Sequence, residues 1–289
     1  MTDHLKGLLI TMIGVLFVVP DSLFVRLIDA DPIVTSFWRA LSAGTIVLVI
    51  LLAWQGARGF RAVMGTGWIG AIYIVLIGST APAFVMAVTY TSVANVVFIF
   101  ACMPVFAAVF SRILMAEPIR LRMVLTMLVV LVGLAIIAYG SGTSEIASLK
   151  GDLWALYIAA AYALALTLVR QLRAVPMIPA IPIAFLGTAV ILGVVSDPMP
   201  ALGANWALFL GHGAVIAVAT CLLTIGPRYI SSAEVALLVL LESVLAPLLV
   251  WAVVGEDPGP WAILGGAVVI GALIVSNLIA LRASRRRLA

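Results

Sequence analysis

Four ionisable residues lie inside apolar stretches of this chain, where a charge is unfavourable unless it has a role. They are Asp21, Arg39, His212 and Glu242. At the centre of a membrane helix, a charged side chain costs about 2.5–3.5 kcal/mol on insertion scales. Such residues pair with one another, bind a polar solute or carry a proton. These four are therefore the first candidates for a binding site.

Asp21 and Arg39 fall at matching depths of the first two apolar segments, about six residues from the same side of each. We therefore expect an ion pair, which lowers the cost of burying both charges. The pair either locks two helices together or presents Arg39 to a substrate carboxylate. Trp38, next to Arg39, offers an aromatic face to a substrate or belongs to the aromatic belt of the outer leaflet.

Glu242 lies about halfway along the ninth apolar segment, with no basic residue level with it on a neighbouring segment. It could bind a substrate amine, carry a coupling proton or stay protonated in a dry site. His212 lies nearer the outer third of the eighth segment, where a hydrogen-bonded structural histidine is the simpler interpretation. Glu234 opens the ninth segment and is expected to be a first-turn acid stabilised by the helix dipole.

The elements that position these residues are predicted to be membrane helices. The chain has 289 residues, of which 65% are hydrophobic and 10% charged, so lipid must surround most of it. The apolar runs are continuous rather than alternating, which favours helices over a β-barrel. Ten runs are long enough to cross a bilayer: 7–27, 33–53, 66–87, 93–114, 122–139, 152–169, 178–195, 206–226, 233–254 and 261–281.

Loop charges predict the direction of these helices. With the amino terminus in the cytoplasm, 13 Lys and Arg residues fall inside and only Arg26 and Lys150 outside. This asymmetry satisfies the positive-inside rule and supports the count of ten. Both termini are therefore expected in the cytoplasm.

The chain also contains an internal repeat. Residues 90–118 align with 229–257 without a gap at a shift of 139, with seven identities that include Tyr90 with Tyr229 and Glu117 with Glu256. Because each half holds five spans, the second half enters the membrane in the opposite sense. We expect two inverted five-helix repeats around a central cavity, comprising residues 1–140 and 141–289 of one membrane domain. Helices one to four and six to nine should line this cavity, and helices five and ten should lie at the periphery.

Several functions are disfavoured by what the sequence contains. Cys102 and Cys221 lie inside apolar segments without His or Cys partners at ligand spacing, so we expect no metal site and no cofactor. The net charge of +4 comes from loops and a tail and does not indicate nucleic-acid binding. No motif of a hydrolase, metalloenzyme or phosphate-binding loop is present, so an integral membrane enzyme and a channel-like uniporter remain weaker alternatives to a carrier.

The chain as a whole resembles a known family. The chain is similar to the drug/metabolite transporter superfamily of EamA type. The features that carry the resemblance are the ten spans in two inverted halves, Glu117-Pro118 after the fourth span and the corresponding Glu256-Asp257 in the second half. Two stretches depart from the family pattern. Val18-Val19-Pro20-Asp21 replaces a Trp-Gly pair in helix one, and Ser243 follows Glu242 where members carry proline.

The resemblance implies a function. It suggests a secondary transporter of the bacterial inner membrane that exports amino acids or related metabolites, similar to the aromatic amino-acid exporters. It therefore implies a small-molecule substrate, a surrounding lipid bilayer and no catalytic residues. No nucleic-acid partner is expected, and we expect a monomer.

Overall fold

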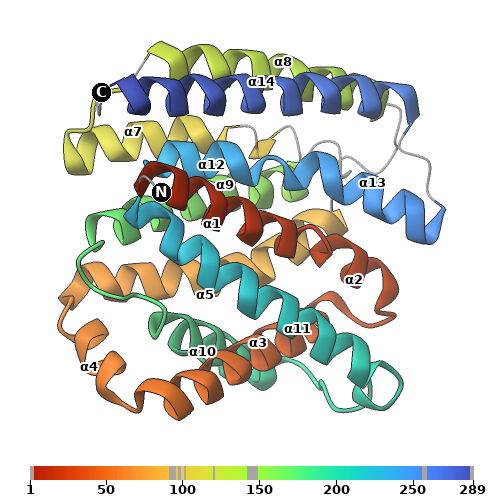
Figure 1. Cartoon of the computed structure of the whole chain (residues 1–289). Helices are drawn as coiled ribbons and strands as arrows, with labels where there is room; N and C mark the ends of the chain where they lie inside the picture. The colour runs from red at the N-terminus through yellow and green to blue at the C-terminus, as the bar shows by residue number, and fades with distance from the viewer. Residues whose placement is uncertain are drawn as a thin grey trace.

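The computed structural model shows an all-α protein (Figure 1). The structure describes residues 3–90, 96, 99–100, 102–119, 121–141, 149–255 and 259–286. The helices in these ranges are α1 (Asp3–Val18), α2 (Asp21–Leu27), α3 (Pro32–Gln55), α4 (Arg58–Met64), α5 (Gly67–Tyr90), α7 (Met103–Met115), α8 (Leu121–Ser141), α9 (Leu149–Gln171), α10 (Ala180–Val195), α11 (Leu202–Ile225), the 3₁₀ turn η1 (Gly226–Arg228), α12 (Ser232–Val239), α13 (Glu242–Val254) and α14 (Gly259–Arg286).

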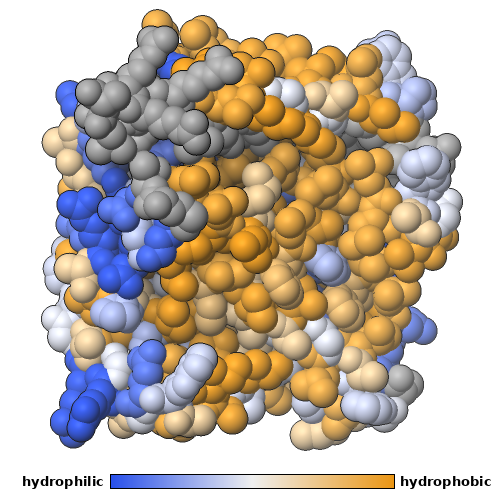
Figure 2. Space-filling model, viewed as in Figure 1, coloured by the Kyte–Doolittle hydropathy of each residue, from blue (hydrophilic) through white to orange (hydrophobic). Residues whose placement is uncertain are grey.

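The protein is a multi-pass membrane protein. In the described part of the chain, six helical segments are long and apolar enough to cross a membrane, and four shorter apolar helices accompany them. Together they correspond to the ten predicted spans. Hydrophobic residues cover most of the face shown in Figure 2, and hydrophilic residues gather on the left side of the view, where both chain ends lie (Figures 1 and 2).

Two spans predicted to be continuous, 7–27 and 233–254, are each divided into two helices. The first breaks at Val19 and Pro20, directly before Asp21. Proline has no N–H to continue the helical ladder, which accounts for this break. The second breaks at Leu240 and Leu241, directly before Glu242. No proline or glycine lies at that turn, so no residue type signals it in the sequence.

The duplicated segments each contribute one described helix at equivalent positions of the two halves. Helix α7 begins at Met103 and α13 at Glu242, and their last residues, Met115 and Val254, are also 139 positions apart. The cap residues that follow are both left-handed, with φ of 54° at Ala116 and 81° at Gly255. From their first residues α7 runs toward the side of the chain ends and α13 runs away from it (Figure 1). The repeat is therefore inverted, as expected.

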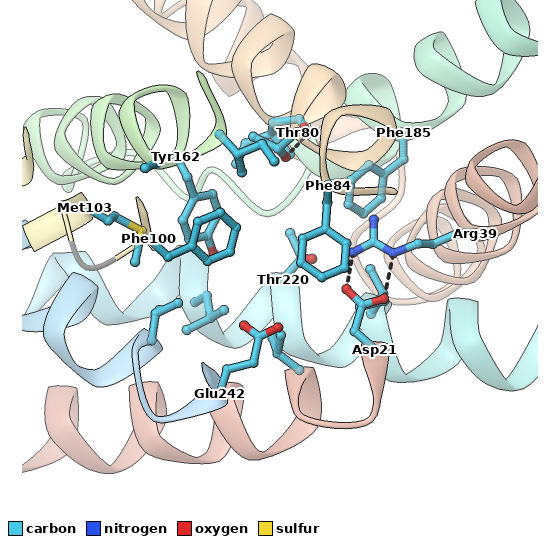
Figure 3. Close-up of a pocket in the computed structure, with 17 residues that line it drawn as sticks. Asp21, Arg39, Thr80, Phe84, Phe100, Met103, Tyr162, Phe185, Thr220 and Glu242 are labelled. Atoms are coloured by element: carbon cyan, nitrogen blue, oxygen red, sulfur yellow. Dashed lines mark hydrogen bonds and ion pairs between the residues drawn. The ribbon is translucent and has the colours of Figure 1, made fainter. Parts of the chain in front are cut away.

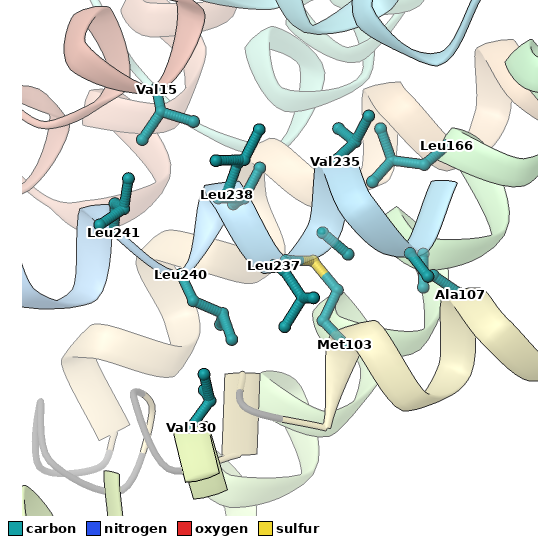
Figure 4. Packing of buried hydrophobic residues seen from close by; sticks show 14 of the residues in the cluster. Val15, Met103, Ala107, Val130, Leu166, Val235, Leu237, Leu238, Leu240 and Leu241 are labelled. Carbon is teal, nitrogen blue, oxygen red and sulfur yellow. The ribbon is translucent and has the colours of Figure 1, made fainter. Parts of the chain in front are cut away.

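Buried apolar side chains from both halves form the core that holds the broken helices. Leu240 and Leu241, in the turn of the ninth span, are 0% and 7% exposed. They belong to one cluster with Val15 of α1, Met103 of α7 and other residues of both repeats (Figure 4). Because this turn is packed on all sides by apolar groups, the position of Glu242 after it is fixed.

Helices α8 and α14, the fifth and tenth spans, pack on each other along one edge of the molecule (Figure 1). A side-chain carbon at Gly133 of α8 would lie 2.9 Å from the carbonyl oxygen of Gly265 in α14. The two backbones therefore approach closely through small residues, as in many membrane helix pairs. The predicted peripheral position of these two spans is confirmed.

Candidate functional site

A central pocket lies between the two halves, with a volume of about 100 Å³ (Figure 3). All eight spans that were expected to line a cavity contribute residues to it, and no described residue of α8 or α14 does. Most of the lining is apolar, including the aromatic rings of Phe84, Phe100 and Phe185. The polar members are Asp21, Arg39, Thr80, Tyr162, Thr220 and Glu242.

The predicted ion pair between Asp21 and Arg39 is confirmed. Arg39 donates from Nε to Asp21 Oδ1 at 3.1 Å and from Nη2 to Asp21 Oδ2 at 2.7 Å. Asp21 is 3% exposed and Arg39 9% exposed. Two parallel bonds between a guanidinium and a carboxylate are the strong geometry for such a pair. The pair joins α2, which starts after the Pro20 break, to the first third of α3.

His212 contributes a third group to this pair. Its Nε2 lies 2.5 Å from Asp21 Oδ1, and its ring stacks on Phe24 with centroids 5.2 Å apart. The imidazole is 0% exposed and is not among the residues that line the pocket. His212 therefore lies behind Asp21 and supports it from α11. The structural interpretation of this histidine fits its surroundings better than direct contact with a substrate.

Glu242 presents its carboxylate to the pocket from the first turn of α13 (Figure 3). No ion pair or hydrogen bond joins its side chain to another described residue. The amino end of a helix favours a negative charge, so the start of α13 suits an acidic residue. Met103, the equivalent residue of the first half, lines the same pocket from the start of α7. The repeat is therefore symmetric in shape at this point and asymmetric in charge.

Trp38 lies apart from the pocket. Its indole Nε1 donates to the carbonyl oxygen of Pro198 at 2.9 Å, and its ring stacks on Phe209 with centroids 5.6 Å apart. It is not among the lining residues. Of the five predicted site residues, the structure brings Asp21, Arg39 and Glu242 to one pocket, places His212 behind Asp21 and leaves Trp38 outside.

Aromatic and hydroxyl side chains of the pocket were missed by sequence reasoning. Phe84 and Phe100 face each other with ring centroids 6.3 Å apart, and Tyr162 lies near them (Figure 3). Thr80 and Thr220 add hydroxyl groups to the wall. Such residues are ordinary in apolar spans, so no signal in the sequence separates these from the rest of the core.

The described ranges contain no group of three or more His, Cys, Asp or Glu side chains that could hold a metal ion. Cys102 and Cys221 are free thiols. The chemistry that the pocket offers is therefore ion pairing, hydrogen bonding and contact with aromatic faces.

Comparisons with known proteins agree with this architecture. The family model described as the EamA-like transporter family matches residues 5–139 and 149–278. No curated protein matches the sequence. One solved crystal structure, described only as that of a protein, superposes with a TM-score of 0.80 at 18% identity, covering 97% of this chain and 99% of the other. At that identity the likeness shows the fold alone.

Proposed function

The chain belongs to the EamA-like transporter family, and from its central pocket we propose that it exports amino acids or related small metabolites by alternating access. The observation that carries this proposal is the position of Glu242. Its carboxylate faces a mostly apolar pocket and has no charged partner among the described residues. An ammonium group on a small amphipathic solute would supply the missing positive charge.

The other charges of the pocket balance one another. Arg39 is held by Asp21 through both carboxylate oxygens. A pocket with one unbalanced carboxylate favours a solute that carries an amino group. The rings of Phe84, Phe100 and Tyr162 would then contact the apolar part of the solute, and they also favour a nearby cation. Glu242 could alternatively exchange a proton for the solute, since both compete for the same oxygens.

Transport would follow from the inverted repeat. The pocket is built from both halves, so rocking one half against the other would open it to each side of the membrane in turn. We place the two halves at residues 1–140 and 141–289, with both termini in the cytoplasm of a bacterium and the chain in the inner membrane. The excess of Lys and Arg in the loops on the side of the termini supports this orientation.

Counterflow in proteoliposomes tests the proposal. Vesicles are loaded with unlabelled amino acid and uptake of the same labelled amino acid is measured for a panel of neutral and aromatic amino acids and their amines. A carrier gives saturable uptake that depends on the internal solute, whereas a channel-like uniporter gives neither saturation nor counterflow. Glu242→Gln should abolish this uptake. Ser243→Ala, a change at the next residue, which does not line the pocket, should leave it intact. Absence of counterflow for the whole panel would contradict the proposal.

A further inference from the structure

A second and larger cavity lies on the side of the molecule where the chain ends are found. Its volume is about 350 Å³, and it shares no lining residue with the central pocket. Its polar lining includes His4, Ser111, Glu117, Arg122, Arg170 and Glu234. The residues come from both repeats, so this cavity also lies between the halves. Its charged side chains fall into two groups, which differ in how firmly they are held.

The first group is held firmly. Glu234 accepts from Arg122 Nη2 at 2.6 Å and contacts His4 Nε2 at 3.3 Å through the same oxygen. Its other oxygen accepts from the backbone N–H and the hydroxyl of Ser231, which completes a capping box at the start of α12. The expected first-turn position of Glu234 is confirmed, but its carboxylate also ties His4 and Arg122 of the first half to the second. Apart from His4 Nδ1, which has no hydrogen-bond partner among the described residues, these groups have little capacity left for a ligand.

The second group, Arg170 and Glu117, is held loosely. Arg170 Nε lies 3.3 Å from Glu117 Oε1, longer than the 2.7–2.9 Å or so of a strong charge-assisted bond. The Glu117 side chain is 30% exposed, and no described residue bonds its second oxygen. Arg170 is oriented by a bond from Nη1 to the carbonyl oxygen of Pro227 at 2.9 Å. A cation and an anion therefore face the cavity with bonding capacity unused.

Ser111 supplies an independent observation. It is 4% exposed, lines the cavity, and its hydroxyl has no hydrogen-bond partner among the described residues. Other hydroxyls in these helices donate to the carbonyl four residues earlier, as Thr126 and Thr167 do at 2.8 and 2.9 Å. Buried polar groups in proteins almost always have a partner. The Ser111 hydroxyl is therefore a buried hydrogen-bonding group on the cavity wall that a ligand can engage.

We propose that this cavity is a second binding site, specific for the zwitterionic head group of a free α-amino acid. The carboxylate would bind Arg170, the ammonium group would bind Glu117, and Ser111 would add a hydrogen bond. A zwitterion inserted between Arg170 and Glu117 replaces one loose pair by two contacts and leaves the net charge of the site unchanged. Ile119, Met123 and Ile230 provide an apolar wall for the side chain.

The two sites lie along the same helix. Helix α7 contributes Met103 to the central pocket and Ser111 to this cavity, which places them about 12 Å apart along the helix axis. The second site is therefore placed to hold a solute on the side of the chain ends before it reaches Glu242. Binding at this site does not depend on transport, so it can be tested separately from the proposed function.

Protection of a single cysteine tests the proposal on the full chain in detergent. Cys102 and Cys221 are replaced by alanine, and Ile119→Cys places a thiol on the cavity wall. L-leucine and L-phenylalanine should each slow labelling of this thiol by a water-soluble maleimide. Leucinamide, a cation, and N-acetyl-leucine, an anion, should protect at least about tenfold less well, because each lacks one charge-assisted contact. No protection by either amino acid would overturn the proposal and leave the cluster as a clamp between the halves.

Variants locate the protecting site. Arg170→Gln should raise the half-protecting concentration about tenfold or more, and Ser111→Ala should raise it several-fold with less risk to folding. Arg173→Gln, at a nearby exposed arginine, should leave it unchanged. Glu242→Gln should also leave it unchanged, because the central pocket is a separate site. Loss of protection in Glu242→Gln would assign the signal to the central pocket and overturn the proposal, and so would full protection in both Arg170→Gln and Ser111→Ala.

Discussion

Arg39 donates one hydrogen bond to each oxygen of the Asp21 carboxylate, at 3.1 and 2.7 Å, from a position 18 residues further along the chain. His212 binds the same carboxylate from α11. One carboxylate therefore joins three helices, two from the first half and one from the second. This arrangement explains why two charges are tolerated in an apolar interior, and it leaves Glu242 as the unbalanced charge among the described residues of the pocket.

Asp21→Asn should destabilise the protein strongly. The substitution leaves Arg39 buried without its counter-charge, which costs about 3–5 kcal/mol when one partner of a buried pair is removed. Thermal unfolding in detergent should show a large drop in the midpoint. Asp31→Asn is the matched control, because Asp31 caps the exposed start of α3 and asparagine caps equally well.

The companion change Arg39→Gln separates two roles. If Arg39 is a structural partner of Asp21, the substitution should also lower the unfolding midpoint. If Arg39 is a substrate ligand, the variant should fold well and lose substrate binding. An Arg39→Gln protein that folds normally and transports at the original rate would contradict both interpretations of the pair.

The matched positions of Met103 and Glu242 predict that the carboxylate can be moved between the halves. Glu242→Met alone should abolish counterflow. Adding Met103→Glu places a carboxylate at the first turn of α7, on the wall of the same pocket, where the helix dipole also favours it. The double variant should regain saturable uptake. If it folds and stays inactive, the pocket does not use the two halves equivalently.

The cluster around Glu234 predicts a contrast between two acids. Glu234→Gln should lower stability by about 3 kcal/mol, since it leaves the partly buried Arg122 without the buried carboxylate that it pairs with. Glu117→Gln should cost less than about 1 kcal/mol, since its pair with Arg170 is longer and more exposed. Unfolding midpoints of the two variants, measured side by side, check this. Equal losses would mean that distance and exposure do not decide the strength of these pairs.

Orientation in the membrane is tested by a reporter that is active only outside the cytoplasm. Fused after Ala289, it should give no signal, because the loop charges place the carboxyl terminus inside. The same reporter fused within the loop that follows α2 should be active. A strong signal from the carboxyl-terminal fusion would invalidate the ten-span topology.

Much of this architecture could be predicted from the sequence because lipid imposes simple rules. Length and hydropathy mark ten spans, and matching depth predicts that Asp21 meets Arg39. The contact of His212 with Asp21 could not be predicted, since 191 residues separate them and depth alone does not say which helices touch. The turn at Leu240 could not be predicted either. It depends on apolar packing from both halves rather than on a helix-breaking residue.

The pocket wall shows the same limit. Phe84 and Phe100 meet across the cavity, yet each is one aromatic residue among many in apolar spans. Charged residues in a membrane are rare and therefore informative, whereas aromatic residues acquire meaning only when the fold brings them together. The second cavity depends on tertiary contacts as well, because Ser111 and Arg170 lie on different repeats.

The most direct test of the central claim is access of water-soluble reagents to the ninth span. Single cysteines at Glu242 and Val239, which both line the pocket, are compared with Val253→Cys, a position on α13 that is 56% exposed on the apolar surface. A membrane-impermeant thiol reagent should label the first two, and transported solute should slow labelling of Val239→Cys, which retains Glu242. Val253→Cys should stay unlabelled. If Glu242→Cys and Val239→Cys remain as unreactive as Val253→Cys from both sides of the membrane, the ninth span faces no transport pathway and the account is wrong.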